Sequence, residues 1–155
     1  MLEIANLSHT YANGTVVTVL DGDVQDRATL MRKPGETPQQ AGQRIQKYNM
    51  GRYAKDFARA AAGNLVIIRH EQGGVVEYSA YGHLSAGIPV KVGQPVKQGQ
   101  PIGKVGDTGD SAAVHLHFQV NAGPDPFTSK SLPVRFADVK DPSGIDDVLE
   151  LVNAG

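Results

Sequence analysis

The sequence predicts a mainly β domain, an antiparallel sheet with barrel-like or sandwich-like packing and one helical insertion. Three observations support this fold class. Short runs rich in β-branched residues recur along the chain, 18 glycines and 9 prolines separate them, and a single stretch carries helix signals instead. Short strands divided by Gly/Pro turns are typical of antiparallel sheets. With 155 residues, 40% of them hydrophobic, the chain is long enough for one domain with an ordinary core.

Five apolar runs are predicted to be strands. They are residues 15–20, 65–68, 75–81, 102–105 and 114–120. Each run is short and is bounded by turn-forming residues, as expected of strands rather than helices. Together they predict a sheet that draws on most of the chain.

The helix signals begin at Thr37, which can cap a helix with Pro38 at its first position and Gln40 completing a capping box. An alanine-rich stretch follows as far as residue 62. We expect one helix over residues 38–62, or two shorter ones interrupted near Gly51, within an insertion at residues 27–62 between two strands. Two interpretations stay open for this insertion: a surface excursion packed on one face of the sheet, or a wall of a substrate groove.

A small internal repeat occupies residues 90–103, where an apolar residue is twice followed by a turn with the letters Gly-Gln-Pro. Such units suit tightly curved strands, because glycine relieves the corners. On physical grounds we interpret this segment as scaffold. Lipoyl and biotinyl carriers share a similar glycine pattern, but none of these turns offers a convincing carrier lysine.

Composition excludes several functions. With 15 Lys and Arg against 16 Asp and Glu, and with no basic run, the chain has no electrostatic footprint for nucleic acid or anionic lipid. The absence of cysteine excludes disulfides, thiolate-bound zinc and a cysteine nucleophile, so a metal must be held by His, Asp or Glu. Residues 1–8 lack a signal-peptide pattern, and no run approaches the ~20 apolar residues of a membrane span. We therefore expect a soluble chain, of open oligomeric state.

Residues 114–120 carry the most informative chemistry. Because residues two apart in a strand share a face, His115, His117 and Gln119 lie on one side. The intervening apolar residues then point into the core. A third histidine, His83, ends another predicted strand. This arrangement predicts a metal ligand beside a proton-transfer group, the alternative being an incidental histidine pair on an exposed face.

Five motifs occur in a fixed order. They are G-N-L-V-I-I-R-H at 63–70, Y-G-H-L at 81–84, V-G-Q-P-V-K-Q-G-Q-P-I-G at 92–103, G-D-T-G-D-S at 106–111 and H-L-H-F at 115–118. In this order they resemble the lysostaphin-type (LytM-like) zinc peptidases. Residues 14–24 resemble the strand and turn after that family's first metal motif, and residues 131–136 resemble a tail of some members. The resemblance spans residues 14–136, apart from the helical insertion.

The resemblance implies an activity and a location. It implies a zinc endopeptidase that hydrolyses peptide bonds of bacterial peptidoglycan in the cell envelope, periplasmic or extracellular. It further implies that His117 is a zinc ligand, and that His83 and His115 are catalytic, positioning or deprotonating the attacking water and stabilising the oxyanion. His70 is expected to be structural or to lie behind the site. We expect the peptidase domain to span residues 1–140, and residues 141–155 to form a tail with a short helix.

One departure from the family pattern affects the expected metal site. The first two zinc ligands belong to an H-x-x-x-D motif that should precede Gly14, and no such motif stands there. His9 falls near the slot of the missing aspartate and is a candidate replacement ligand. Three explanations stay open: the first motif was lost, the domain binds peptidoglycan or regulates a hydrolase without cutting, or the site is completed by His9 or another chain.

Overall fold

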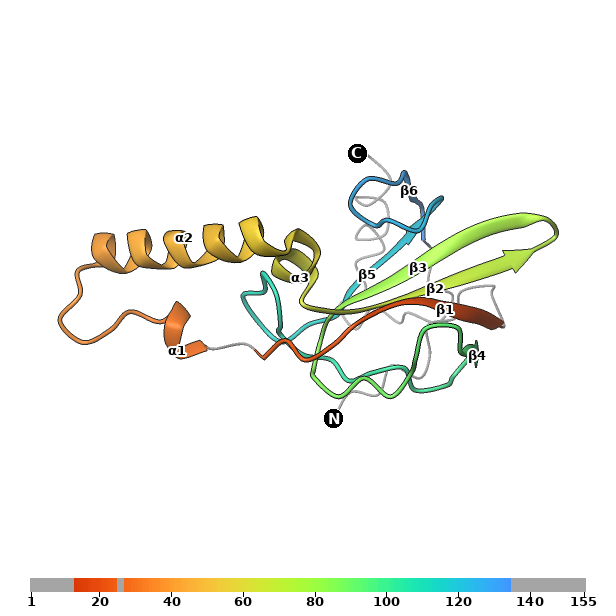
Figure 1. The fold of residues 1–155 in the computed structure, drawn as a ribbon, viewed down its shortest axis with the longest axis horizontal. Helices are drawn as coiled ribbons and strands as arrows, with labels where there is room; N and C mark the ends of the chain where they lie inside the picture. Colours follow the sequence, from red (N-terminus) through yellow and green to blue (C-terminus); the bar gives the residue numbers. More distant parts are fainter. Residues whose placement is uncertain (1–12, 25–26, 135–155) are drawn as a thin grey trace, which may run out of the picture.

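The computed structural model describes residues 13–24 and 27–134 (Figure 1). The elements in order are β1 (Asn13–Leu20), α1 (Arg27–Leu30), α2 (Pro38–Lys55), α3 (Phe57–Ala62), β2 (Asn64–Gln72), β3 (Val75–Leu84), β4 (Pro95–Lys97), β5 (His117–Asn121) and β6 (Ser131–Leu132). The strands form one sheet in the order β4-β1-β2-β3-β5-β6, and every neighbouring pair is antiparallel. This confirms the predicted mainly β, antiparallel fold.

The strand predictions differ in their outcome. The runs at 15–20, 65–68 and 75–81 lie within β1, β2 and β3, whereas only the second half of the run at 114–120 is a strand. The predicted strand at 102–105 is wrong. Its backbone makes only an isolated bridge, between Val105 and Leu84. Ile102 is nevertheless buried, so its apolar character reflects core packing rather than a ladder of hydrogen bonds.

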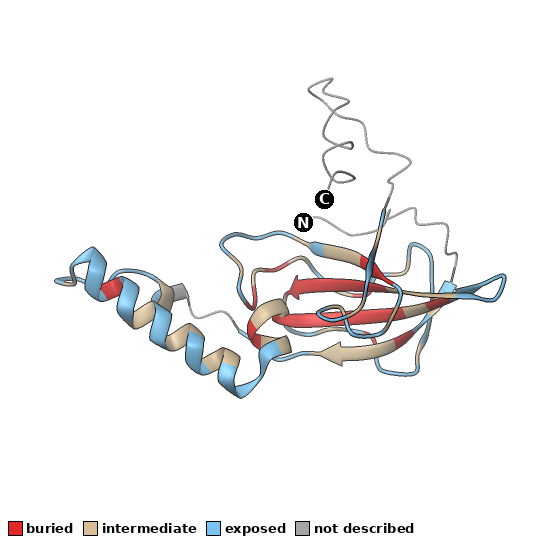
Figure 2. Cartoon of the chain, turned by 90° about the horizontal axis from the view of Figure 1, so that it is seen from above, coloured by how far each residue is buried: buried red, intermediate tan, exposed pale blue. Residues whose placement is uncertain are grey.

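The core lies on both faces of the central strand β2. Val66 and Ile68 pack into one buried cluster, and Leu65 and Ile67 pack into another. Successive side chains of a strand point to opposite faces, so a strand covered on both sides needs a continuous apolar run. Figure 2 shows the buried residues concentrated in the middle of the sheet.

The six-residue repeat contributes to the first of these clusters. Its apolar members are Val90, Val96 and Ile102, all buried. In the turn between the first two, the Gln94 N–H donates to the Lys91 carbonyl at 3.0 Å, and the Gln94 side chain accepts from the Lys91 N–H at 3.1 Å. Gln100 and Lys97 repeat both bonds at 3.1 and 3.2 Å. The repeat is therefore a pair of self-capped turns that present buried residues at even spacing.

The helical segment starts as predicted but breaks elsewhere. Thr37 accepts from the Gln40 N–H at 3.2 Å, and the Gln40 side chain accepts from the Thr37 N–H at 2.9 Å, which completes the capping box. The predicted break near Gly51 is wrong. The helix ends at Asp56, whose extended backbone stops α2 while its carboxylate caps α3 by accepting from Arg59 N–H at 3.0 Å. A glycine inside a helix costs only about 1 kcal/mol, so α2 continues through Gly51.

Helix α2 extends away from the sheet instead of lying along it (Figures 1 and 2). Of its residues only Ala41 is buried. Helix α3 is shorter and lies at the start of β2, with Ala60 buried and Ala62 packed against the second core cluster. An excursion packed on one sheet face therefore does not describe α2, which together with α1 forms an arm.

Several expectations fall outside the described residues. They concern His9, the stretch that should hold the H-x-x-x-D motif, and the tail at 141–155 with its short helix. The division into a domain at 1–140 and a tail stays a prediction. Among the described helices, none combines the length and the hydropathy that a transmembrane span requires.

Candidate functional site

The structure brings together the three histidines that the sequence singled out. His117 is the first residue of β5. In the pairing of β3 with β5 it lies opposite Gly82, the residue that precedes His83. His115 lies just before β5 and bridges to Gly106. The ring centroids of His83 and His115 are 4.7 Å apart, and those of His83 and His117 are 5.7 Å apart. Three imidazoles therefore share one end of the sheet, although their chemical roles stay a prediction.

His83 is held in an unusual backbone conformation. Its φ of 59° makes it the one residue other than glycine with positive φ in the described part of the chain. The left-handed region costs a residue with a Cβ about 1–2 kcal/mol. The ring is 5% exposed, and its Nδ1 lies 2.7 Å from the Thr108 carbonyl. A carbonyl oxygen can only accept a hydrogen bond, so Nδ1 carries the hydrogen and donates it, and Nε2 keeps its lone pair.

The environment of His83 favours the neutral ring. Burial lowers the pKa of His83 below its ordinary value, and the Thr108 carbonyl acts in the opposite direction. The neighbouring rings of His115 and His117 lower the pKa further, because a positive charge on one imidazole disfavours a charge on the next. At neutral pH His83 is thus an uncharged proton acceptor.

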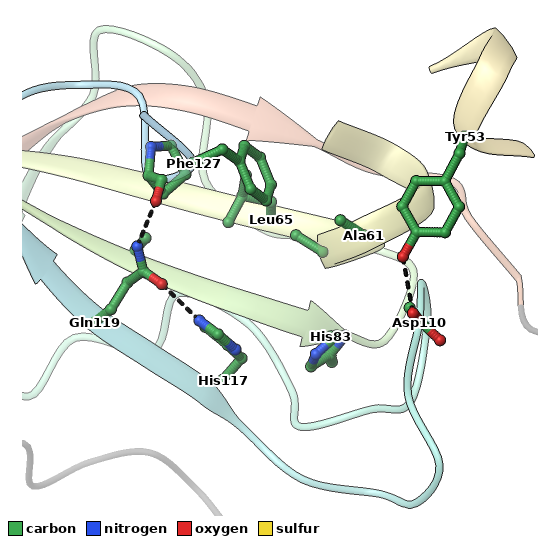
Figure 3. A pocket seen from close by; sticks show the side chains of 11 residues that line it. Tyr53, Ala61, Leu65, His83, Asp110, His117, Gln119 and Phe127 are labelled. Carbon is green, nitrogen blue, oxygen red and sulfur yellow. Dashed lines mark hydrogen bonds between the residues drawn. The ribbon is translucent and has the colours of Figure 1, made fainter. Parts of the chain in front are cut away.

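Similar hydrogen bonds fix the other two rings. His115 Nδ1 lies 2.8 Å from the Ala113 carbonyl. His117 Nε2 lies 2.7 Å from the side-chain oxygen of Gln119, whose amide nitrogen donates to the Pro126 carbonyl at 2.8 Å (Figure 3). Because the amide nitrogen is used there, the Gln119 oxygen faces His117 and accepts a hydrogen bond from its Nε2–H. His117 therefore keeps its lone pair on Nδ1.

This donor set fits one ligand position of a zinc site. A ligating histidine usually donates its other N–H to an oxygen acceptor, as His117 does to Gln119. Catalytic zinc takes three protein ligands, however. Within residues 13–24 and 27–134, no group of three or more His, Asp or Glu side chains is arranged to hold a metal ion. The described residues thus do not complete a zinc site, and His9, the predicted further ligand, lies outside them.

A pocket of about 260 Å³ opens beside His83 and His117 (Figure 3). Its lining residues are Tyr53, Ala61, Ala62, Leu65, Ala80, His83, Asp110, His117, Gln119, Pro126 and Phe127. Tyr53 in α2 donates from its hydroxyl to an Asp110 carboxylate oxygen at 2.7 Å. The sequence indicated Gln119 through its strand face, and Asp110 through the motif at 106–111. Nothing in the local sequence distinguished Phe127, because its place depends on how the loop between β5 and β6 folds.

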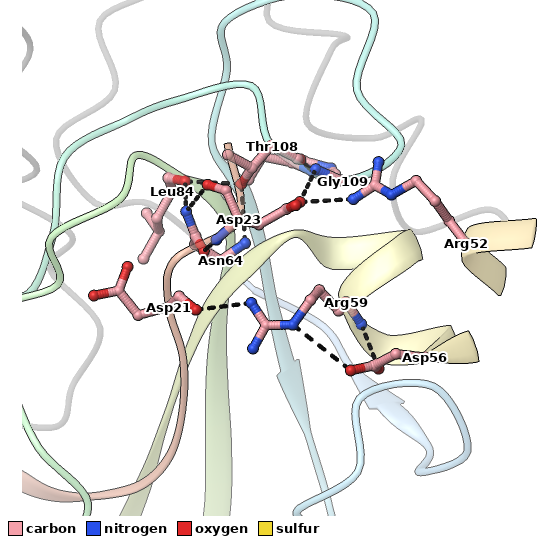
Figure 4. A network of polar contacts seen from close by, with 10 residues as sticks. Asp21, Asp23, Arg52, Asp56, Arg59, Asn64, Leu84, Thr108 and Gly109 are labelled. Carbon is pink, nitrogen blue, oxygen red and sulfur yellow. Dashed lines mark hydrogen bonds and ion pairs between the residues drawn. The ribbon is translucent and has the colours of Figure 1, made fainter. Parts of the chain in front are cut away.

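A polar network holds the loop at residues 106–111 behind His83 (Figure 4). Asn64 is fully buried at its centre, and its side-chain nitrogen donates to the carbonyls of Asp23 and Leu84, each at 2.9 Å. The Thr108 hydroxyl donates to the Leu84 carbonyl at 2.8 Å and accepts from the Asn64 N–H at 2.9 Å. The exit of β1, the end of β3 and this loop are therefore joined at Asn64.

The arm is attached to the same network. Arg52 in α2 pairs with the Asp23 carboxylate at 2.7 Å, and the same carboxylate oxygen accepts from Gly109 N–H at 3.2 Å. The backbones of α3 and the loop also meet directly. A Cβ built on Gly63 would lie 2.5 Å from the Gly109 nitrogen, and one on Gly109 would lie 2.3 Å from the Gly63 nitrogen. The Asp110 N–H also donates to the Ala61 carbonyl at 3.0 Å, so the end of α3 packs backbone to backbone against the loop that supports His83.

His70 does not join the site. It lies toward the far end of β2, where its Nε2 is 2.7 Å from the Ser79 hydroxyl and its Nδ1 is 3.1 Å from the Asn13 carbonyl. The ring is buried and links three neighbouring strands. This agrees with the structural role expected for it.

Comparison with known proteins supplies the family. The model of peptidase family M23 matches residues 36–129, more than half of the chain and a range that includes all three site histidines. The chain belongs to peptidase family M23. This confirms the resemblance drawn from the ordered motifs. Among solved structures the chain is similar to the crystal structure of a zinc containing peptidase from Vibrio cholerae, with 28% identity and a TM-score of 0.42. That match covers 70% of this chain and 21% of the other, so this chain spans about a fifth of that protein's length.

Proposed function

We propose that this member of family M23 is a zinc-dependent endopeptidase domain that hydrolyses peptide bonds of bacterial peptidoglycan, acting in the cell envelope. The observation that carries the proposal is the meeting of His83, His115 and His117 beside an open pocket. Each ring has one nitrogen fixed by an oxygen acceptor. The rings are therefore positioned before a substrate arrives, as acid–base catalysis requires.

The two predicted catalytic histidines are suited to proton transfer. In His83 and His115 the proton sits on the nitrogen that faces a backbone carbonyl, which leaves Nε2 able to accept a proton. A neutral imidazole can take a proton from an attacking water and later return it to the leaving amine.

Zinc enters the proposal through His117. Its Nδ1 would hold the ion, with the remaining ligands supplied from outside the described residues. When bound in a peptidase site, zinc supplies Lewis acidity toward the scissile carbonyl and the water. The Gln119 side chain orients the His117 ring for this purpose.

The test combines metal uptake with cleavage. The purified full chain is loaded with zinc, dialysed and analysed for metal content, then incubated with purified sacculi while released peptides are followed by mass spectrometry. We expect near-equimolar zinc and peptide release, both abolished in His117→Ala. The matched control is Gln72→Ala, which alters an exposed residue at the far end of β2. A chain that takes up no zinc and releases no peptide would refute the proposal.

A non-catalytic role is the second candidate, and the missing H-x-x-x-D motif before Gly14 favours it. In this case the domain would bind peptidoglycan or regulate a wall hydrolase. Co-sedimentation with sacculi without any release of peptides would support this role. Measurable cleavage that depends on His115 would rule it out.

A further inference from the structure

We propose that the pocket beside His117 is a substrate subsite for an apolar side chain, and that the helical segment α2–α3 builds one of its walls. The inference rests on the proposed peptidase function, because it specifies which residue the same site accepts next to the bond that is cut. The subsite is the part of the site that is lined by residues of the helical insertion.

The lining of the pocket favours an apolar occupant. Ala61 and Ala62 come from α3, Leu65 and Ala80 come from the neighbouring strands β2 and β3, and Pro126 and Phe127 come from the loop after β5. Because the side chains of Ala61 and Ala62 are small, they leave space that bulkier lining residues would occupy. Aliphatic walls offer no hydrogen-bond partner, so a polar side chain placed between them would lose its hydration without compensation.

Most of the polar groups that line the pocket are already paired. The Gln119 amide is held by His117 and by the Pro126 carbonyl. The Asp110 carboxylate accepts from the Tyr53 hydroxyl. A substrate that places its scissile carbonyl near the imidazoles would therefore direct an adjacent side chain between the apolar walls (Figure 3).

An aromatic row extends one side of the pocket outward. The rings of Tyr53 and Phe57 have centroids 5.6 Å apart, and Phe57 meets Phe127 edge to face at 5.1 Å. Phe57 is 56% exposed and Phe127 is 40% exposed. Exposed aromatic side chains that contact each other across two distant segments are well suited to binding, because they offer large apolar area at low entropy cost. The row joins the helical segment to the loop between β5 and β6.

The size of the pocket sets the expected preference. A glycine has no side chain to place in a space of about 260 Å³. A residue with one or more aliphatic carbons displaces water from apolar surface, and each such group changes discrimination by roughly tenfold or more. We therefore expect peptides with alanine or leucine next to the cleaved bond to be preferred over peptides with glycine.

Two sets of synthetic peptides test this preference. The first set carries Gly, Ala, Leu or Lys at either position flanking the bond, and kcat/KM is measured for each with the zinc-loaded full chain. The second set has the same residues but a reduced, uncleavable bond, and its Kd is measured by titration calorimetry. Alanine or leucine should improve both quantities at least tenfold over glycine. A best response to lysine would overturn the apolar assignment, because it would place Asp110 in charge of recognition.

A variant that fills the pocket locates the effect. Ala61→Phe in α3 should weaken binding of the leucine analogue at least tenfold and leave the glycine analogue unchanged. The matched control is Ala54→Phe, an exposed position of α2 outside the pocket lining, which should change neither. Should Ala61→Phe fail to fold by circular dichroism, Phe127→Ala serves instead, since removing this ring from the lining should enlarge the pocket and shift the preference toward larger side chains.

The outcomes separate the subsite from the peptidase function. Selective binding of apolar analogues that Ala61→Phe abolishes, without cleavage of any peptide, would uphold the subsite and refute the endopeptidase. Cleavage with no preference among Gly, Ala and Leu, and no response to Ala61→Phe, would refute the subsite alone. Neither binding nor cleavage would refute both.

Discussion

The end of the sheet that carries the histidines and the projecting arm differ in burial and in the kind of contact that stabilises them. Around Asn64 and His83 the structure is buried, and its contacts join residues far apart in the sequence. The arm is mostly exposed and is stabilised by local contacts such as the capping box at Thr37. The core positions the histidines, whereas the arm adds Tyr53 to the pocket and the adjoining helix α3 adds Ala61 and Ala62. The two regions should therefore respond differently to mutation.

The largest effect is expected from the core beneath the histidines. Leu84 follows His83 and is fully buried in the first core cluster. Leu84→Ala should lower the free energy of unfolding by about 2–5 kcal/mol, because it removes buried methyl groups and leaves a cavity. Urea denaturation followed by circular dichroism measures this change. Val92→Ala, at a residue 64% exposed, is the control and should change stability little. Equal effects of the two substitutions would contradict the assignment of the core.

The next effect concerns the polar hub. Asn64→Ala removes the side-chain bonds to Asp23 and Leu84 and leaves the half-buried N–H and carbonyl of Asp23 without their Asn64 partner, whereas the Leu84 carbonyl keeps the Thr108 hydroxyl. Unpaired buried groups cost about 1–3 kcal/mol each, so we expect a loss of about 2–3 kcal/mol together with a shift of the His83 ring resonances in NMR spectra. Lost stability with unchanged His83 resonances would show that the hub does not position the histidine.

A cap mutation should affect the arm alone. Thr37→Ala removes the acceptor for the Gln40 N–H, which is worth about 1 kcal/mol in a helix. We expect faster amide exchange in the first turns of α2 and unchanged exchange in β2 and β3. Exchange measured by NMR in both regions checks this, and faster exchange in the sheet would show that the two regions unfold together.

The smallest effect is a dependence on pH at the outer end of the arm, in the loop between α1 and α2. Hydrogen bonds from the Arg44 side chain and the Lys33 N–H lower the pKa of Glu36 to about 2 from its ordinary value of 4.5. A lowered pKa means that the interaction stabilises the arm above pH 4.5 and is lost as the pH falls toward 2. The Arg44 side-chain resonance should move across this window. In Glu36→Gln that movement should disappear, and its persistence would identify another titrating partner.

The features that the sequence could predict are those that depend on local motifs or on strand periodicity. The central strands were predictable because β2 is covered on both faces and its apolar run is continuous, and the capping box because Thr37, Pro38 and Gln40 form a local motif. The meeting of His115 and His117 was indicated by their spacing of two residues, although His115 lies just before β5 and not within it. In each case the deciding interactions lie within a few residues, or follow directly from strand periodicity.

The wrong or missing predictions have several physical causes. The run at 102–105 is apolar because Ile102 enters the core, a reason that periodicity cannot separate from strand formation. The helix breaks at Asp56 because the Asp56 carboxylate caps α3. Gly51 has only a weak tendency to interrupt a helix, so α2 continues through it. The pocket could not be predicted as a whole, since Phe57 and Phe127 meet only once the loop after β5 has folded.

The close approach of Gly63 and Gly109 limits where the chain can change in length. An added residue at the end of α3 would force the two backbones apart and displace the loop behind His83. The opposite end of the arm has no such restriction, since Gly35 lies in open space with nothing within 4 Å of a Cβ built on it. Extra residues, a fluorophore or a fused tag are therefore best accommodated at the outer tip of the arm, where an inserted segment would leave the histidines in place.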